Sequence, residues 1–113
     1  GHFASHVRRM RKLYHQRREF LHHKIETAIG EPLSLIPTDG GMHSVYLLPA
    51  HWDDRQIREL CEQRGLGIRD LSRYYTGQER RNGLVIGFAG YNESDINEGI
   101  DQLTDAIGLY RNP

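Results

Sequence analysis

The chain has 113 residues, and its fifteen basic and fifteen acidic side chains cancel to a net charge of zero when histidine is neutral. This length supports one small domain with one hydrophobic core. The balanced charge gives no sign of a nucleic-acid or membrane partner, and no apolar run approaches the ~18 residues of a membrane helix. Cys61 is the only cysteine, which excludes an internal disulfide and favours a reducing, cytoplasmic setting.

Residues 1–30 are predicted to form one long amphipathic helix that ends at Gly30. Its apolar positions recur at three- and four-residue steps: Phe3, Val7, Met10, Tyr14, Leu21, Ile25 and Ala28. The segment carries seven basic and two acidic residues, a net charge of +5. A basic helix can bind phosphates, but the complete apolar stripe favours a packed helix with a solvated charged face. Because the helical pattern starts at once and no initiator Met is present, we expect a piece of a longer protein.

A hairpin and a helix are expected next. The apolar segments 33–37 and 42–49 are separated by the turn sequence "TDGG", which predicts two antiparallel strands. Residues 53–65 begin with Asp53 or Asp54 as the N-cap and end at Gly65, which predicts a helix of about three turns.

The last part of the chain predicts two strands and a helix. A strand is expected over 66–72, a loop over 73–83, and a second strand over 84–89, "LVIGFA". The apolar run of this second strand is continuous, so we expect it to be buried on both faces. A helix capped by Asn92 or Ser94 follows. The whole order predicts an α/β (α+β) fold, a small mixed or antiparallel sheet packed by helices.

The residues predict no active site of their own. The sequence has no nucleophile motif, phosphate-binding glycine loop or pair of carboxylates at catalytic spacing. His2 and His6 are one helical turn apart, but no second pair of ligands accompanies them. We therefore predict no catalytic residue and no metal site.

Four segments together carry a resemblance to a known family: "GHFASHVRRMRKLYHQRR", "GGMHSVYLLP", "GLGIRDLSRYYTG" and "NGLVIGFAGYNESDINEGIDQL". Nearly the whole chain resembles the C-terminal end of the aminotransferase-like domain in the MocR subgroup of GntR-type bacterial transcriptional regulators. That domain is similar to fold-type I aminotransferases, which use pyridoxal 5'-phosphate (PLP). "LSRYY" and "NGLVIGFAG" are the most specific parts of the match.

The resemblance implies a fragment of a homodimeric, cytoplasmic regulator. Residues 1–30 would lead out of a missing large domain, and residues 31–113 would form the small domain that closes over the site. DNA would be bound only by a missing N-terminal winged helix, and PLP only by the full-length parent. Lys12 and Lys24, the only lysines, lie in no context resembling the cofactor-lysine motif, so no cofactor is expected in the fragment.

The resemblance also implies where an effector would bind. In fold-type I aminotransferases an arginine three residues before the phenylalanine of the "VIGFA" strand holds the substrate carboxylate, and here Val85 stands in its place. Sensing of an amino-acid-like or PLP effector is thus favoured over transamination, while the small domain of a working aminotransferase is the alternative. Arg73, beside Tyr74, is the predicted substitute anion anchor, although a surface loop arginine fits as well. Gly41, Met42 and His43 are predicted to face the effector, and a plain hairpin turn fits them equally.

Overall fold

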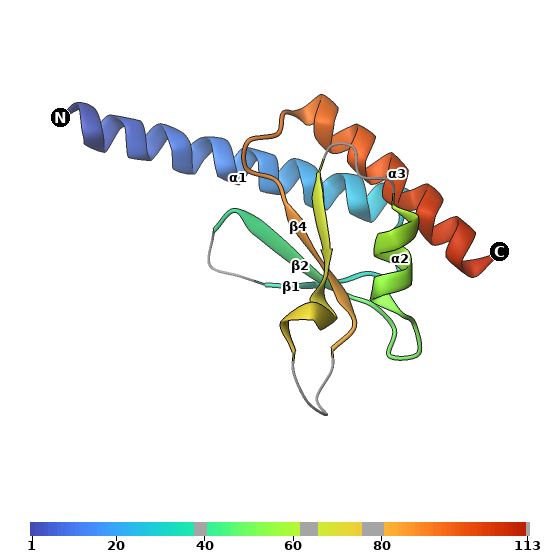
Figure 1. The fold of residues 1–113 in the computed structure, drawn as a ribbon. Helices are drawn as coiled ribbons and strands as arrows, with labels where there is room; N and C mark the ends of the chain where they lie inside the picture. The colour runs from blue at the N-terminus through green and yellow to red at the C-terminus, as the bar shows by residue number, and fades with distance from the viewer. Residues whose placement is uncertain (38–40, 62–65, 76–80, 113) are drawn as a thin grey trace.

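The computed structural model describes residues 1–37, 41–61, 66–75 and 81–112. Figure 1 shows the order of its elements: α1 His2–Ala28, β1 Ser34–Ile36, β2 His43–Leu47, α2 Asp54–Leu60, β3 Gly67–Asp70, the 3-10 helix η1 Leu71–Tyr74, β4 Gly83–Gly87 and α3 Glu93–Arg111. The predicted fold class, with a long first helix and a small sheet packed by helices, is confirmed.

The four strands form one sheet in the order β1-β2-β4-β3, and every neighbouring pair is antiparallel. The predicted hairpin is confirmed, since Ser34 of β1 pairs with Leu47 of β2 and Ile36 pairs with Val45. Residues 38–40 of its turn lie outside the described residues. β4 lies inside the sheet between β2 and β3, as its apolar sequence indicates. Because β2 and β3 both run antiparallel to β4, they run in the same direction.

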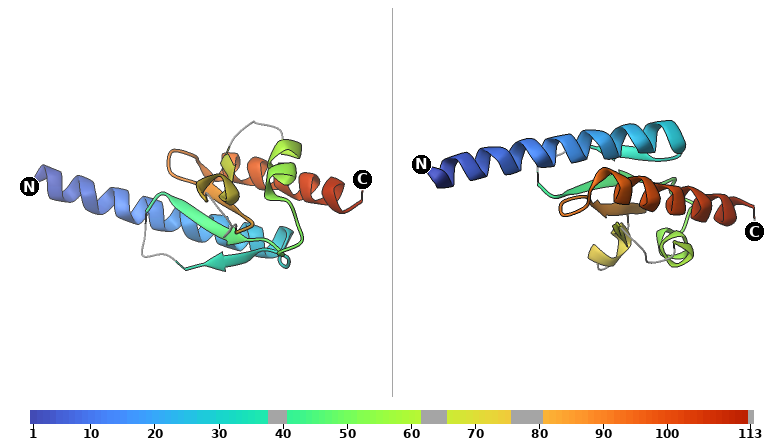
Figure 2. Two further views of the ribbon diagram at one scale, coloured as in Figure 1. Left: turned by 60° about the horizontal axis from the view of Figure 1, so that its bottom comes forward. Right: turned by 90° about the horizontal axis from the view of Figure 1, so that it is seen from above.

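The two faces of the sheet differ in burial. One face contributes buried side chains to the core, and Figure 2 shows α1 and α3 running side by side along the sheet. On the opposite face, called the open face below, Val45 and Val85 are half-buried and Arg69 is exposed. The prediction that the β4 strand is buried on both faces is therefore wrong. The continuous apolar run of β4 does not show that the helices cover only one face of the sheet.

The core joins the covered face of the sheet to the second half of α1 and to one side of α3. Its fully buried members come from these elements and, with Ile57, from α2: Leu21, Ile57, Leu84, Ile86, Phe88, Ile96, Ile100 and Leu103. Cys61 is buried as well, and this burial raises the pKa of its thiol, as expected for a packing residue rather than a reactive one. Among the described residues no helix is both long and apolar enough to cross a membrane.

Helix α3 begins where the sequence predicts. Asn92 is its N-cap, and its side chain accepts a hydrogen bond from the backbone N–H of Asp95 at 2.8 Å. The carboxylate of Asp95 accepts one in return from the backbone N–H of Asn92 at 3.2 Å. This reciprocal pair satisfies two N–H groups that a helix start otherwise leaves without partners.

Two boundaries in the middle of the chain differ from the prediction. α2 ends at Leu60, because Cys61 adopts an extended backbone as its C-cap, and the predicted stop at Gly65 lies outside the described residues. β3 ends at Asp70, and the next residues form η1 instead of continuing the strand to residue 72. The carboxylate of Asp54 explains the second difference, since it accepts hydrogen bonds from the backbone N–H and the hydroxyl of Ser72. The N-cap of α2 is Asp53.

The first half of α1 projects away from the sheet, as Figure 1 shows at its N-terminal end. The buried residues of this helix, Leu21 and Ile25, both belong to its second half. Phe3 is 80% exposed, although it belongs to the same apolar stripe. The projecting half therefore presents apolar surface that the rest of this chain does not cover.

We expect the isolated chain to self-associate through this projecting half. Burial of its apolar surface contributes ~25 cal/mol per Å² and favours dimers or larger species. Sedimentation velocity at increasing concentration should show species heavier than the monomer. Phe3→Ser should shift the profile toward the monomer, because it removes the most exposed apolar ring. A strictly monomeric profile of the unchanged chain at high concentration would contradict the prediction.

Candidate functional site

The five residues predicted to contact an effector fall into two groups at opposite ends of the sheet. His43 pairs with Gly87 at one end of β4, and Gly41 and Met42 precede it. Asp70 pairs with Leu84 near the other end of β4, and Arg73 and Tyr74 follow it in η1. The open face of the sheet lies between the two groups.

The first group, Gly41, Met42 and His43, is held by hydrogen bonds to its backbone carbonyls. The carbonyl of Gly41 accepts a hydrogen bond from Nη2 of Arg18 at 2.8 Å, and the carbonyl of Met42 accepts one from the N–H of Phe88 at 3.1 Å. Gly41 has a φ of 91°, a conformation that favours glycine. A Cβ placed on Gly87 would lie 3.4 Å from Cδ2 and Nε2 of the His43 ring, so this imidazole lies over Gly87 on the open face.

Arg73 in the second group has an internal partner. Its Nε and Nη2 donate to the same carboxylate oxygen of Asp70 at 2.9 and 2.7 Å. Burial raises the pKa of Asp70, but the hydrogen bonds from Arg73 and Ser72 outweigh this effect, so the pKa lies below its usual value. Arg73 lines a shallow groove with Asp70 and residues of α2. It therefore remains a candidate anion anchor, although Asp70 competes for its charge.

Arg69 is a candidate binding residue that the sequence analysis did not identify. It pairs in register with Val85, and Val85 pairs with Val45 on its other side. Its side chain is hydrogen-bonded to Tyr74, and this bond raises the pKa of Arg69 above its usual value. The alternation in "GIRD" contains the signal for it, because a strand that buries Ile68 and Asp70 must direct Arg69 to the opposite face.

A buried network of hydrogen bonds centred on Asp54 holds η1 in place. Asp54 is only 1% exposed, and its Oδ2 accepts hydrogen bonds from the backbone N–H groups of Ser72 at 2.8 Å and Gly83 at 3.2 Å. Its Oδ1 accepts a third from the hydroxyl of Ser72 at 2.7 Å. The start of α2, η1 and the start of β4 are thereby tied together. This network fixes where Arg73 and Tyr74 lie.

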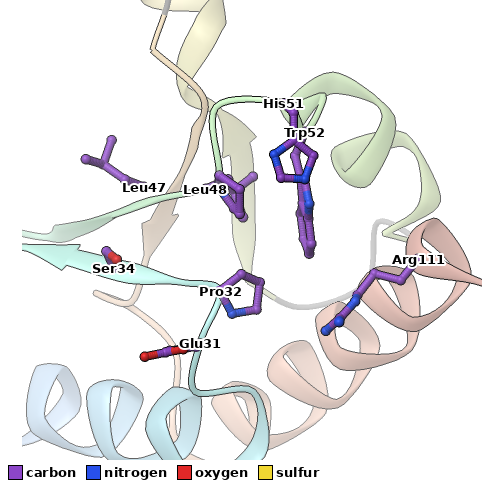
Figure 3. A pocket seen from close by; sticks show the side chains of 9 residues that line it. Glu31, Pro32, Ser34, Leu47, Leu48, His51, Trp52 and Arg111 are labelled. Carbon is purple, nitrogen blue, oxygen red and sulfur yellow. The ribbon is translucent and has the colours of Figure 1, made fainter.

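A separate cavity of about 780 Å³ lies beside the start of β1 and the end of β2. Figure 3 shows His51 and Trp52 on one side of it, Arg111 on another, and Pro32 and Glu31 below. The guanidinium of Arg111 lies 5.9 Å from the centre of the Trp52 ring. None of the five predicted effector residues lines this cavity, so it is distinct from the predicted site.

The lysines of this chain do not suit covalent attachment of PLP. Lys24 forms an ion pair with Asp101 at 3.1 Å between α1 and α3. Lys12 is exposed on α1. Neither residue lies on the open face or lines one of the cavities described above.

Nearly the whole chain is similar to curated bacterial regulators. It is 28% identical over 107 residues to the probable rhizopine catabolism regulatory protein MocR of Rhizobium meliloti, covering 95% of this chain and 22% of that protein. It is 29% identical to the HTH-type pyridoxine biosynthesis transcriptional regulator PdxR of Corynebacterium glutamicum, covering 96% of this chain and 23% of that protein. The chain thus spans less than a quarter of these relatives' length. No protein-family model matches it.

The fold is that of part of known aminotransferases. A crystal structure of Pyrococcus horikoshii kynurenine aminotransferase matches 96% of this chain and 27% of its own, with a TM-score of 0.81 and 25% identity. The α-aminoadipate aminotransferase LysN of Thermus thermophilus matches 96% of this chain and 28% of its own, with a TM-score of 0.85 and 16% identity. The resemblance predicted from the sequence is confirmed: the chain resembles the aminotransferase-like small domain of MocR-type regulators.

Proposed function

We propose that this chain, as a part resembling the small domain of MocR-type regulators, senses an effector within a longer bacterial transcriptional regulator. The relatives that support the proposal are regulators by name, and one of them is a regulator of pyridoxine biosynthesis. The parent would bind PLP in its missing large domain, DNA through a missing winged helix, and a second copy of itself as a cytoplasmic homodimer. By itself this chain would have no catalytic activity.

The observation that carries the proposal is Val85 itself, which stands at the place where the resemblance implies an arginine. Val85 belongs to a row of side chains that crosses all four strands, with Ile36 on β1, Val45 on β2 and Arg69 on β3. A valine cannot offset the desolvation of a substrate carboxylate, whereas a guanidinium at this place would. Transamination of ordinary amino acids is therefore disfavoured, and reversible binding of an effector is favoured.

The division of the chain supports a role at an interface. The projecting half of α1 would pack on the missing large domain, and residues 31–113 would close over the effector. In that arrangement Gly41, Met42 and His43 would contact the effector from one end of the open face, and Arg73 and Tyr74 from the other. Met42 is 50% and Tyr74 55% exposed, so both side chains are available for such contacts.

The alternative function is the small domain of a working PLP-dependent aminotransferase. The solved structures favour it, since those with the matching fold are aminotransferases. An uncharacterized aminotransferase of Saccharolobus solfataricus is also 26% identical over 107 residues. The two functions differ in what the full-length parent does with an amino acid.

The deciding experiment uses the purified full-length parent with added PLP. Amino-group transfer from the common L-amino acids to 2-oxoglutarate is measured beside binding to the DNA upstream of its own gene. We expect DNA binding that an amino acid or PLP changes at least several-fold, with no transfer above that of free PLP. Efficient transfer without DNA binding would contradict the proposal and establish the alternative.

A further inference from the structure

The open face of the sheet carries one fixed positive charge beside an apolar surface. Arg69 belongs to the same row as Ile36, Val45 and Val85, and it is the only charged member of that row. Neighbouring strands lie ~4.8 Å apart, so the Arg69 side chain starts directly beside that of Val85. A ligand lying on Val85 would have its charged end within reach of this guanidinium.

Arg69 is exposed on the edge strand β3, in register with Val85. Within the described part of the chain no carboxylate forms an ion pair with it, whereas Arg73 and Arg55 both pair with Asp70. Among the residues that the structure describes, Arg69 is thus the arginine near this site whose charge an incoming anion does not share with an acid. A guanidinium without such a partner also loses less on binding an anion than one that must first leave a carboxylate.

The space around the row suits a small ligand. Gly67 has no side chain, and no atom lies within 4 Å of the place where its Cβ would be, which leaves the open face low next to Arg69. The imidazole of His43 borders the same end, over Gly87. The surface thus combines half-buried aliphatic side chains, a low glycine shelf and one guanidinium. An aliphatic chain that ends in a carboxylate is complementary to this combination.

We infer that Arg69 is the anion anchor of the effector site and binds the carboxylate of an amino-acid-like ligand whose aliphatic part lies on Val85 and Val45. The inference rests on the proposed function and names the chemistry of its ligand.

The test compares acids with amides. Binding of the common L-amino acids and of their carboxamides to the full-length parent is measured by isothermal titration calorimetry, for the unchanged protein and for Arg69→Gln. Arg111→Gln is the matched control, because Arg111 is also exposed but lines the separate cavity of Figure 3. Circular dichroism verifies that each variant is folded.

We expect Arg69→Gln to weaken binding of the preferred acid roughly ten- to hundredfold, the loss of one charge-assisted hydrogen-bonded pair. Binding of the matching amide should change little, and Arg111→Gln should change neither. Equal affinity of Arg69→Gln and the unchanged protein for the acid would overturn the inference while the proposed function stands. An equal loss for acid and amide would also overturn it, since that marks a structural role. If no amino acid binds the unchanged parent, the inference fails, and the proposed function fails with it only if PLP does not change DNA binding either.

Discussion

Replacing Phe88 by alanine is expected to lower the free energy of unfolding of this chain by about 3–5 kcal/mol. The Phe88 side chain is fully buried where the end of β4 meets the core. Its removal leaves a cavity in the core cluster that Phe88 shares with residues such as Leu21 and Ile96. Its ring also lies 5.2 Å from the guanidinium of Arg18, so the contact between α1 and the sheet is weakened as well.

Urea denaturation followed by circular dichroism measures this effect. Unchanged and variant chains are compared at the same low concentration, because self-association would stabilise both by mass action. Leu109→Ala is the control, since Leu109 is 55% exposed on α3, and a surface change of this kind costs within about 0.5 kcal/mol. A loss for Phe88→Ala no larger than that for Leu109→Ala would show that Phe88 is not part of the core.

Asp54→Ala is expected to cost about 3 kcal/mol of stability. The change leaves the buried N–H groups of Ser72 and Gly83 without their acceptor, and each unsatisfied buried group costs about 1–3 kcal/mol. The Ser72 hydroxyl loses the shorter of its two hydrogen bonds and keeps the one to Asp70 at 3.3 Å. Part of this cost is recovered where water replaces the carboxylate. The start of α2, η1 and β4 should loosen together, because the carboxylate joins all three.

Asp53→Ala is the matched control for this prediction. Asp53 is the adjacent acid, is exposed, and caps α2 by accepting hydrogen bonds from Arg55 and Gln56. Loss of such a cap costs about 1 kcal/mol, well below the effect expected at Asp54. The comparison is made by urea denaturation, with hydrogen exchange of the Ser72 and Gly83 amides as a local measure. If Asp53→Ala destabilises the chain more than Asp54→Ala, the buried network does not have the assigned role.

The different roles of Asp53 and Asp54 could not be predicted from the sequence alone. Either residue fits the cap of α2, because both are acidic and both precede the same apolar pattern. Asp53 is the cap, and Asp54 turns inward to residues 18 and 29 positions further along the chain. A contact over that separation has no local signal, so the 3-10 turn that it stabilises was predicted as strand and loop.

The candidate site, likewise, could be predicted from the sequence only in part. "GGMH" and "LSRYY" were identifiable from the sequence, but their places at opposite ends of the sheet were not. These places follow from β2 and β3 both running antiparallel to β4. Arg73 reads as a free loop arginine until the structure shows its two hydrogen bonds to Asp70.

The sequence by itself determined the helices, the antiparallel hairpin, a cap of the last helix at Asn92 or Ser94, and the resemblance to the small domain of aminotransferase-like regulators. Periodicity, capping residues and turn residues act over a few positions, so one stretch of chain contains all of their information. Only the tertiary structure decided that one face of the sheet stays open and that Arg69 lies beside Val85 on it. Strand register and helix packing depend on contacts between distant segments, and those contacts form when the chain buries its shared core.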